Sequence, residues 1–224
     1  MDKINIVDAS FCTSDPKTIG FPKKHKVFYI PNPVDSSLEK LKNYNKKSFN
    51  SDVFFAMSHG VHRGVLKQGK FDKREIFLDK LMKKIPNIRF DLHGMKTNQP
   101  VWADNYINAI SQSKIGLNLS QGKAVKYYSS DRFAQLIGNG LLVMIDEKTS
   151  FRDYFTDKEI VFYKNIDDLA KKITKYSVND RLRKRIAKKG RDKYFKFFNS
   201  TVVANFIINK TFGNTQKKFI WDNK

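Results

Sequence analysis

Short apolar runs alternate along this chain with segments whose apolar residues recur at helical spacing. Strand patterns lie at 53–58, 88–93, 114–119, 141–145 and 159–163. The runs at 53–58 and 141–145 are typical of buried strands, and 88–93 alternates. The helical pattern covers 72–85, 102–113, 131–137, 167–176, 179–198 and 200–212. Strands that alternate with helices at this spacing form a parallel sheet covered on both faces. The sequence therefore predicts an α/β fold, a doubly wound parallel sheet with additional C-terminal helices.

The segment 127–147, YYSSDRFAQLIGNGLLVMIDE, is the most informative part of the pattern. Ser129, Ser130 and Asp131 suit the start of a helix, and a Gly-Asn-Gly turn at 138–140 suits its end. Arg132 is unusual because the helix dipole disfavours a cation in the first turn. An anionic ligand at the helix N-terminus would reverse that effect. The alternative is that Arg132 pairs with Asp131 or lies in solvent.

The N-terminal part is less regular. Residues 4–7 could form a short strand, and 27–30 are a better strand that runs into the turn PNPVD at 31–35. Residues 36–50 are polar, and they predict a short helix followed by a linker. We therefore expect three parts: an N-terminal segment at 1–50, an α/β domain at 51–212 and a frayed tail at 213–224.

The chain has 224 residues and a formal net charge of +21, which attracts nucleic acid, anionic membranes or phosphorylated ligands. Most of the 43 basic residues are lysines, and the abundance of Lys, Asn, Ile and Phe is what an AT-rich genome encodes, so the charge is a weak functional signal. Cys12 is the only cysteine, which indicates a reducing compartment. No apolar run has the length of a membrane span. We expect a cytoplasmic protein, with peripheral binding to the inner face of the membrane as an open option.

Three loops follow the predicted strands at the edge where parallel sheets bind ligands: 59–70, 120–130 and 146–152. Their Gly, Arg and Lys residues favour a phosphate-bearing ligand. The loop at 59–64 lacks the Gly-Lys-Ser/Thr ending of a Walker motif. His59 and His62 have no Cys or carboxylate at ligand spacing, so we expect no metal site and no cofactor other than the ligand itself.

Three features together resemble a known family: YIPNPVD at 29–35, a strand followed by a Gly/Arg loop at 53–64, and SSDRFAQLIGNG at 129–140. They resemble the nucleotide-binding C-terminal half of GT-B glycosyltransferases of the "glycosyl transferases group 1" kind. The likeness extends over about residues 27–210. It implies a Rossmann-like domain and an enzyme of the hexosyltransferase type. The substrates would be a nucleotide-sugar donor and a cell-surface glycan or glycolipid acceptor, as in the synthesis of envelope polysaccharide.

The resemblance also implies roles for individual residues, although it identifies no catalytic residue. The loop containing His59 and Gly60 would approach the donor diphosphate, and Arg63 or Lys67 would neutralise it. The 127–147 segment would hold phosphate and ribose through Tyr128, Ser129, Ser130, Arg132 and Gln135. Gln135 stands where the family usually has a ribose-binding Glu, and Tyr127 stands where many members have a second Glu.

Only about fifty residues precede the first strong strand, whereas GT-B enzymes have a second Rossmann-like domain there. The chain alone is therefore expected to bind a nucleotide sugar but to transfer it slowly or not at all. A partner chain or a second copy of the chain is the expected partner. Two alternatives stay open at this point. One is a non-catalytic nucleotide-binding half that needs a partner chain. The other is a basic nucleic-acid-binding protein, which is disfavoured because the chain has no known nucleic-acid-binding motif.

Overall fold

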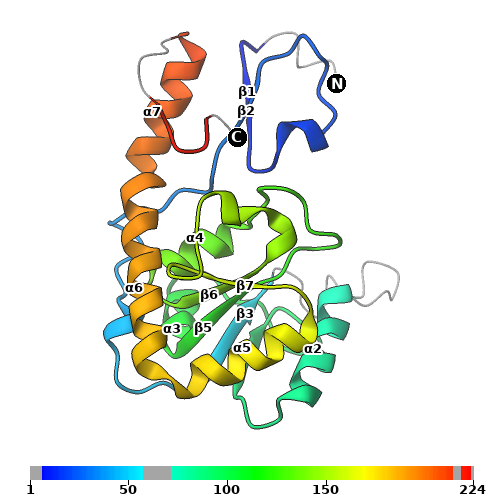
Figure 1. The fold of residues 1–224 in the computed structure, drawn as a ribbon, viewed down its shortest axis with the longest axis vertical. Helices are drawn as coiled ribbons and strands as arrows, with labels where there is room; N and C mark the ends of the chain where they lie inside the picture. Colours follow the sequence, from blue (N-terminus) through cyan, green and yellow to red (C-terminus); the bar gives the residue numbers. More distant parts are fainter. Residues whose placement is uncertain (1–6, 58–71, 214–217, 223–224) are drawn as a thin grey trace.

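A five-stranded parallel sheet forms the centre of the molecule (Figure 1). This computed structural model describes residues 7–57, 72–213 and 218–222. The strands are β3 (Ser51–Ala56), β4 (Phe90–His93), β5 (Ser113–Asn118), β6 (Leu142–Asp146) and β7 (Val161–Tyr163), in the spatial order β4-β3-β5-β6-β7. Every neighbouring pair is parallel. The predicted doubly wound α/β fold is confirmed.

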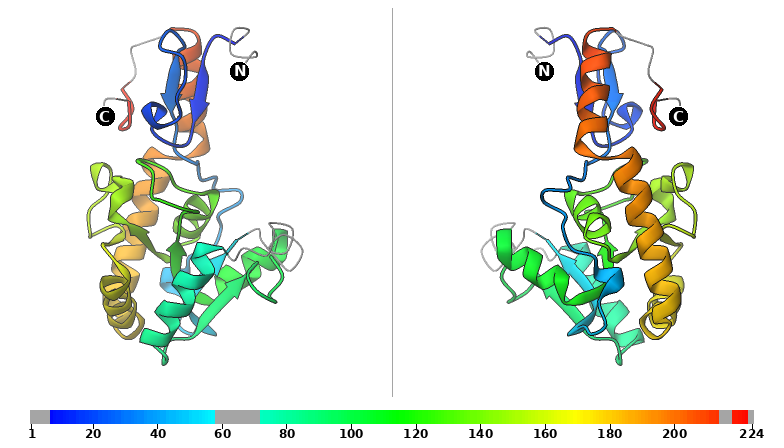
Figure 2. Two further views of the ribbon diagram at one scale, coloured as in Figure 1. Left: turned by 90° about the vertical axis from the view of Figure 1, so that its right-hand side faces the viewer. Right: turned by 90° about the vertical axis from the view of Figure 1, so that its left-hand side faces the viewer.

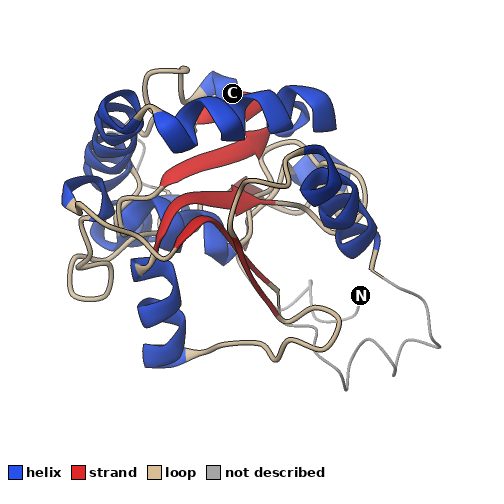
Figure 3. Cartoon of the chain, turned by 90° about the horizontal axis from the view of Figure 1, so that it is seen from below, coloured by secondary structure: helices blue, strands red, loops and turns tan. Residues whose placement is uncertain are grey.

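Helices cover both faces of this sheet (Figure 3). Successive residues of a strand point to opposite faces. Accordingly, Phe54 and Val143 pack with α3 (Ala103–Ser111) and α4 (Asp131–Gly138). Their neighbours Phe55 and Met144 pack on the other face, with α2 (Lys73–Lys84) and α5 (Ile166–Val178). The inner strands β3 and β6 are buried on both faces, and this explains their continuous apolar runs, whereas the edge strand β4 is half-buried and alternates.

The chain order of the strands creates a place for a ligand. From β3 the chain moves outward to β4, then returns to place β5 on the other side of β3. At such a reversal, the connections that leave the carboxyl ends of β3 and β5 run to opposite faces and leave a crevice between them. Ala56 and Asn118, the last residues of these two strands, mark the crevice.

A second, smaller group of elements lies at one end of the molecule (Figure 2). It consists of the parallel strands β1 (Ser10–Cys12) and β2 (Val27–Tyr29) beside α7 (Ser200–Thr211), which follows the long helix α6 (Asp180–Phe197). Phe11 and Phe28 both pack edge-on against Phe206 of α7, with centroid distances of 6.4 and 6.2 Å. None of the described helices combines the length and apolar character needed to cross a bilayer.

The PNPVD segment connects these two groups at the junction of α6 and α7. The amide of Val34 donates to the carbonyl of Phe198 (3.1 Å), and the amide of Ser200 donates to the carbonyl of Val34 (2.8 Å). Ser200 also donates from its hydroxyl to Asp35 (2.7 Å). The segment is therefore held by the chain's C-terminal helices.

The prediction for residues 36–50 was wrong. They form turns and one short 3-10 helix, Asn43–Asn45, in place of an α-helix and a linker. Asn43 is buried, and its side-chain amide donates to the carbonyls of Ile110 (2.7 Å) and Ser113 (3.0 Å). These contacts attach the segment to the α/β domain.

The last helix, α7, begins at Ser200, and the side chain of Asn199 caps it by accepting from the amide of Val202. The C-terminal tail differs from prediction. The tail, described over 218–222, is packed: Phe219 and Trp221 are buried against Phe206, with centroid distances of 5.0 and 5.4 Å. Aromatic burial therefore orders a segment that lacks helical or strand periodicity.

Candidate functional site

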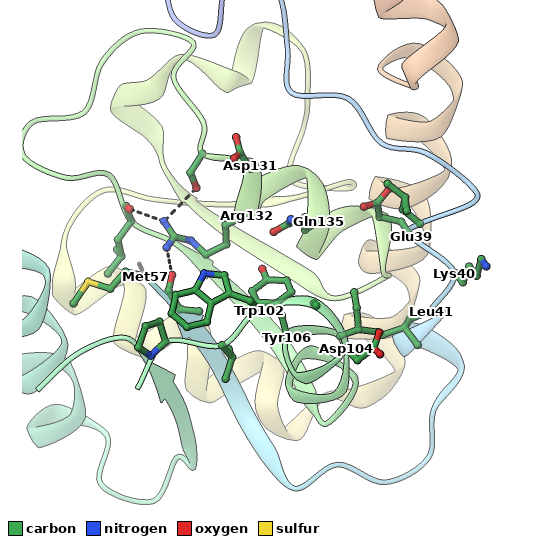
Figure 4. Close-up of a pocket in the computed structure, with 18 of the residues that line it drawn as sticks. Glu39, Lys40, Leu41, Met57, Trp102, Asp104, Tyr106, Asp131, Arg132 and Gln135 are labelled. Carbon is green, nitrogen blue, oxygen red and sulfur yellow. Dashed lines mark hydrogen bonds between the residues drawn. The ribbon is translucent and has the colours of Figure 1, made fainter. Parts of the chain in front are cut away.

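A cavity of about 970 Å³ opens at the carboxyl ends of β3 and β5 (Figure 4). Its walls come from the start of α4, the start of α3 and residues 37–41, which are far apart in sequence. Its volume falls at the upper end of small-molecule sites. Residues from the described loops and helices that line it include Glu39, Met57, Arg74, Trp102, Tyr106, Tyr128, Ser130, Arg132 and Gln135.

Arg132 joins the two strands that border the crevice. Its guanidinium donates to the carbonyl of Ala56 at the end of β3 and to the carbonyl of Leu119 just after β5, the latter at 3.2 Å. It also donates to the hydroxyl of Ser130 (3.2 Å), and its Cζ lies 4.5 Å from the centroid of the Phe55 ring. Arg132 is therefore fixed in the cavity wall by neutral partners.

The charge of Arg132 has no compensating carboxylate. The side chain is 9% exposed, and among the described residues no carboxylate oxygen lies within 4.0 Å of its nitrogens. Burial lowers the pKa of Arg132 to about 10, and the neighbouring cation Arg74 adds to this effect. Since this value is well above 7, Arg132 stays charged at neutral pH. A buried, uncompensated cation is costly, and a bound anion would offset that cost.

The expected alternative, an ion pair between Arg132 and Asp131, is not formed. Asp131 is exposed at the start of α4. Ser130 occupies the N-cap position, but its hydroxyl donates to the side-chain oxygen of Asn118 (2.9 Å) and does not cap the helix. The positive end of α4 therefore meets the cavity without a capping side chain.

Two buried polar atoms at the cavity lack partners among the described residues. They are Nε of Arg132 and the hydroxyl oxygen of Tyr106. Burial raises the pKa of Tyr106 well above its usual value, so its hydroxyl stays protonated and able to donate. Unsatisfied buried polar groups are rare in native proteins, and two at one cavity indicate a site that a polar ligand completes.

The structure brings four of the predicted site residues together at the cavity: Tyr128, Ser130, Arg132 and Gln135. Ser129 is 2% exposed and does not line it; its carbonyl accepts from the side-chain amide of Asn32 (2.8 Å). Four other predicted residues lie outside the described part of the chain: His59, Gly60, Arg63 and Lys67.

Tyr127, at the position of the family's second Glu, packs in the hydrophobic core. Its ring packs between Tyr29 and Tyr154, with centroid distances of 5.3 and 5.0 Å. Its hydroxyl donates to Asp153 (2.5 Å). Burial, followed by the contact with Asp153, raises the pKa of Tyr127 to about 12.

Sequence reasoning missed Glu39, Arg74, Trp102 and Tyr106, which come from elements brought together only by the fold. Glu39 is the acidic side chain near Gln135 (Figure 4). It is 8% exposed, and burial raises its pKa. Its carboxylate accepts from the amide of Asp35 (2.7 Å). The absence of a side chain at Gly138 makes room for Glu39, since a Cβ there would lie 2.6 Å from its Cγ.

Gln135 provides a first test of the site. It lies at the cavity between Arg132 and Glu39 (Figure 4). We expect Gln135→Glu to keep or improve nucleotide affinity, because a carboxylate accepts hydrogen bonds from ribose hydroxyls at least as well as an amide. Calorimetric titration would measure this. Gln112→Glu, the same change after α3, is the matched control and should have no effect. A marked loss of affinity in Gln135→Glu alone would contradict the assignment.

Comparison with known proteins agrees with this geometry. The family described as "Glycosyl transferase-like" matches residues 73–209. No curated protein sequence matches the chain. The fold is similar to an α-glucosyltransferase in complex with UDP and DNA (TM-score 0.67, 14% identity), covering 94% of this chain and 66% of that one.

Two further structures show the same fold. S. aureus TarM in complex with UDP and glycan ligands has a TM-score of 0.66 and 14% identity, covering 95% of this chain and 45% of that one. Sucrose-phosphate synthase from Thermosynechococcus elongatus has a TM-score of 0.60 and 11% identity, covering 95% of this chain and 61% of that one. The chain thus spans about half to two thirds of the length of these proteins. It belongs to the glycosyl transferase-like family and has the fold of a GT-B glycosyltransferase domain.

Proposed function

We propose that the cavity binds the nucleotide-sugar donor of a glycosyltransferase, with the donor diphosphate at Arg132. The observation that carries the proposal is a buried arginine without a carboxylate partner, at the start of an uncapped helix and at the strand reversal. A diphosphate would supply the missing negative charge. Arg74 also lines the cavity, but it is paired with Asp72 (2.7 Å), so the proposal rests on Arg132. Structures of this fold in complex with UDP support the proposal.

The remaining lining suits the uncharged part of such a donor. Trp102 is 64% exposed at the cavity and offers an apolar surface. Hydroxyl groups of the ligand would find hydrogen-bonding partners here. The Tyr106 hydroxyl can donate, the Gln135 amide can donate and accept, and the Glu39 carboxylate can accept. A ligand with a charged end and a hydroxylated end fits this polarity better than an evenly charged polymer does.

The proposed chemistry is transfer of a hexose to a glycan or glycolipid acceptor of the cell surface. Arg132 and the amides of α4 would stabilise the diphosphate as it departs, and this electrostatic contribution does not require a metal. We place the protein in the cytoplasm, with its basic surface against an anionic membrane or a lipid-linked acceptor. A partner chain or a second copy would form the other wall of the cleft.

Binding measurements distinguish donor binding from charge-driven nucleic-acid binding. The protein should bind UDP or GDP more tightly than the matching nucleosides, with equal affinity before and after EDTA treatment. Its affinity for short DNA should fall steeply with salt, because many phosphates are contacted at once. Its affinity for the donor should fall less, because the donor carries only a few charges. Equal affinity for nucleoside and diphosphate would contradict the proposal. DNA binding that is tighter than nucleotide binding at physiological salt would favour the nucleic-acid alternative.

A transfer assay with purified protein tests catalysis separately. The isolated chain should bind the donor and transfer sugar slowly. Orienting two reactants accounts for roughly 7–11 kcal/mol of a barrier, and the described cavity would orient the donor but not the acceptor. No transfer in the presence of a complementing chain would favour the non-catalytic alternative.

A further inference from the structure

A second cavity, of about 380 Å³, lies in the small group of elements formed by β1, β2, α7 and the C-terminal segment. It shares no lining residue with the donor cavity. Its walls are rich in aromatic rings, including Phe21, Phe28, Phe206 and Trp221, and two carboxylates, Asp15 and Asp222, also line it. A pocket that combines aromatic side chains with a few convergent polar groups is a usual form of small-molecule site.

A cation of the protein already lies beside this cavity and disfavours a cationic ligand there. Lys210 forms an ion pair with Asp222 (2.7 Å). Its Nζ also lies 5.3 and 5.5 Å from the ring centroids of Phe28 and Phe206. A cation of the protein therefore already occupies the position that a quaternary ammonium would take over these rings.

An anionic ligand is disfavoured too, because both acidic side chains are mostly buried. The side chains of Asp15 and Asp222 are 14% and 18% exposed. Lys126 lies 3.9 Å from Asp15, at the limit of an ion pair. Lys17 also lines the cavity, but its side chain is exposed and its charge is screened by solvent. The two mostly buried carboxylates would therefore repel a phosphate or a carboxylate more than Lys17 would attract it.

The polar atoms that remain suit hydroxyl groups. Carboxylates only accept hydrogen bonds, and an indole N–H only donates. Trp221 is 3% exposed, and its Nε1 has no partner among the described residues. His25 contributes a ring that stacks on Phe21 at 5.8 Å. We propose that this second cavity binds a neutral sugar unit, whose hydroxyls meet the carboxylates and whose C–H face meets the aromatic rings. The inference goes beyond the proposed donor binding and does not depend on it.

The protein's two tryptophans make a direct test possible, because Trp102 lines the donor cavity and Trp221 lines the second one. In Trp102→Phe protein, Trp221 is the only indole emitter. Titration with a panel of neutral mono- and disaccharides should change its emission saturably for at least one of them. Choline, sugar phosphates and nucleoside diphosphates should leave it unchanged. A panel without any saturable change, or a response to the charged ligands alone, would overturn the proposal.

Variants in the Trp102→Phe background test the position of the ligand. Asp15→Ala should weaken saccharide binding by about tenfold or more, the scale of one hydrogen bond to a charged group. Asp8→Ala, in an exposed part of the same segment, is the matched control. Because Asp15 also caps a turn through the amide of Lys17 (3.0 Å), Phe21→Ala is a second test that leaves this cap in place. Unchanged affinity in both Asp15→Ala and Phe21→Ala would contradict the assigned site.

The complementary Trp221→Phe protein keeps Trp102 as its emitter and reports on the donor cavity. A nucleoside diphosphate should change the Trp102 signal whether or not a saccharide binds the second cavity. If no saccharide changes the Trp221 emission but a nucleoside diphosphate still changes the Trp102 emission, the sugar site is refuted and the proposed donor binding is not.

Discussion

Nucleotide affinity should fall by about 1–3 kcal/mol, roughly 5- to 150-fold, when Arg132 is replaced by alanine. The guanidinium is buried, uncompensated by a carboxylate and held in place by the carbonyls of Ala56 and Leu119. A diphosphate that binds there gains a charge-assisted contact without the cost of ordering the side chain. Isothermal titration with UDP and GDP on parent and variant measures the loss.

Two further variants separate the site from the net charge. Arg181→Ala removes the same charge from an exposed position on α6 and should leave affinity unchanged. Arg132→Lys keeps the charge but cannot donate to two diverging carbonyls and a phosphate at once, so it should recover only part of the affinity. Circular dichroism checks that the fold survives. Superimposable titrations of parent and Arg132→Ala protein would show that the donor phosphate does not lie there.

The largest loss of stability is expected for Gly190→Ala. Gly190 lies on α6 where the helix passes against the backbone carbonyl of Glu159, just before β7. A Cβ at 190 would overlap that carbonyl oxygen, so the helix or the backbone near β7 must move. Forced overpacking costs about 1–3 kcal/mol and occasionally more, which corresponds to a fall of roughly 2–12 °C in Tm for a chain of this size.

Lys189→Ala is the control for Gly190→Ala, since it changes the neighbouring exposed residue of the same helix. Surface changes of this kind usually alter stability by less than about 0.5 kcal/mol. Thermal unfolding followed by circular dichroism gives both values. A Gly190→Ala protein as stable as the parent would mean that α6 does not approach Glu159 this closely in solution.

The sheet and its covering helices were predictable because the inner strands are apolar on both faces and the edge strand β4 alternates, and both patterns show in the sequence. The segment at 127–147 was the clearest case: its helix and strand match α4 and β6 closely. The errors fell where tertiary contacts decide the structure. Asn43 pairs with carbonyls of residues more than sixty positions away, and Trp221 is ordered by aromatic packing. Neither contact leaves a periodic pattern.

The candidate site was predictable only on the side formed by α4. Arg132 was noticeable because its charge opposes the helix dipole, which is a local signal. Glu39 and Tyr106 reach the same cavity from a turn and from another helix, and only the strand order brings them there. Chain-local patterns specify elements, whereas the reversal between β3 and β5 specifies which elements share a crevice.

The most direct test of nucleotide binding at this crevice is a crystal structure of the chain with a nucleoside diphosphate. The proposed function predicts the diphosphate within hydrogen-bonding distance of the Arg132 guanidinium and the first amides of α4, with the nucleoside in the cavity beside Tyr106 and Gln135. A nucleotide bound elsewhere, for example on the basic face of α6 with Arg132 unchanged and without a ligand, would contradict it.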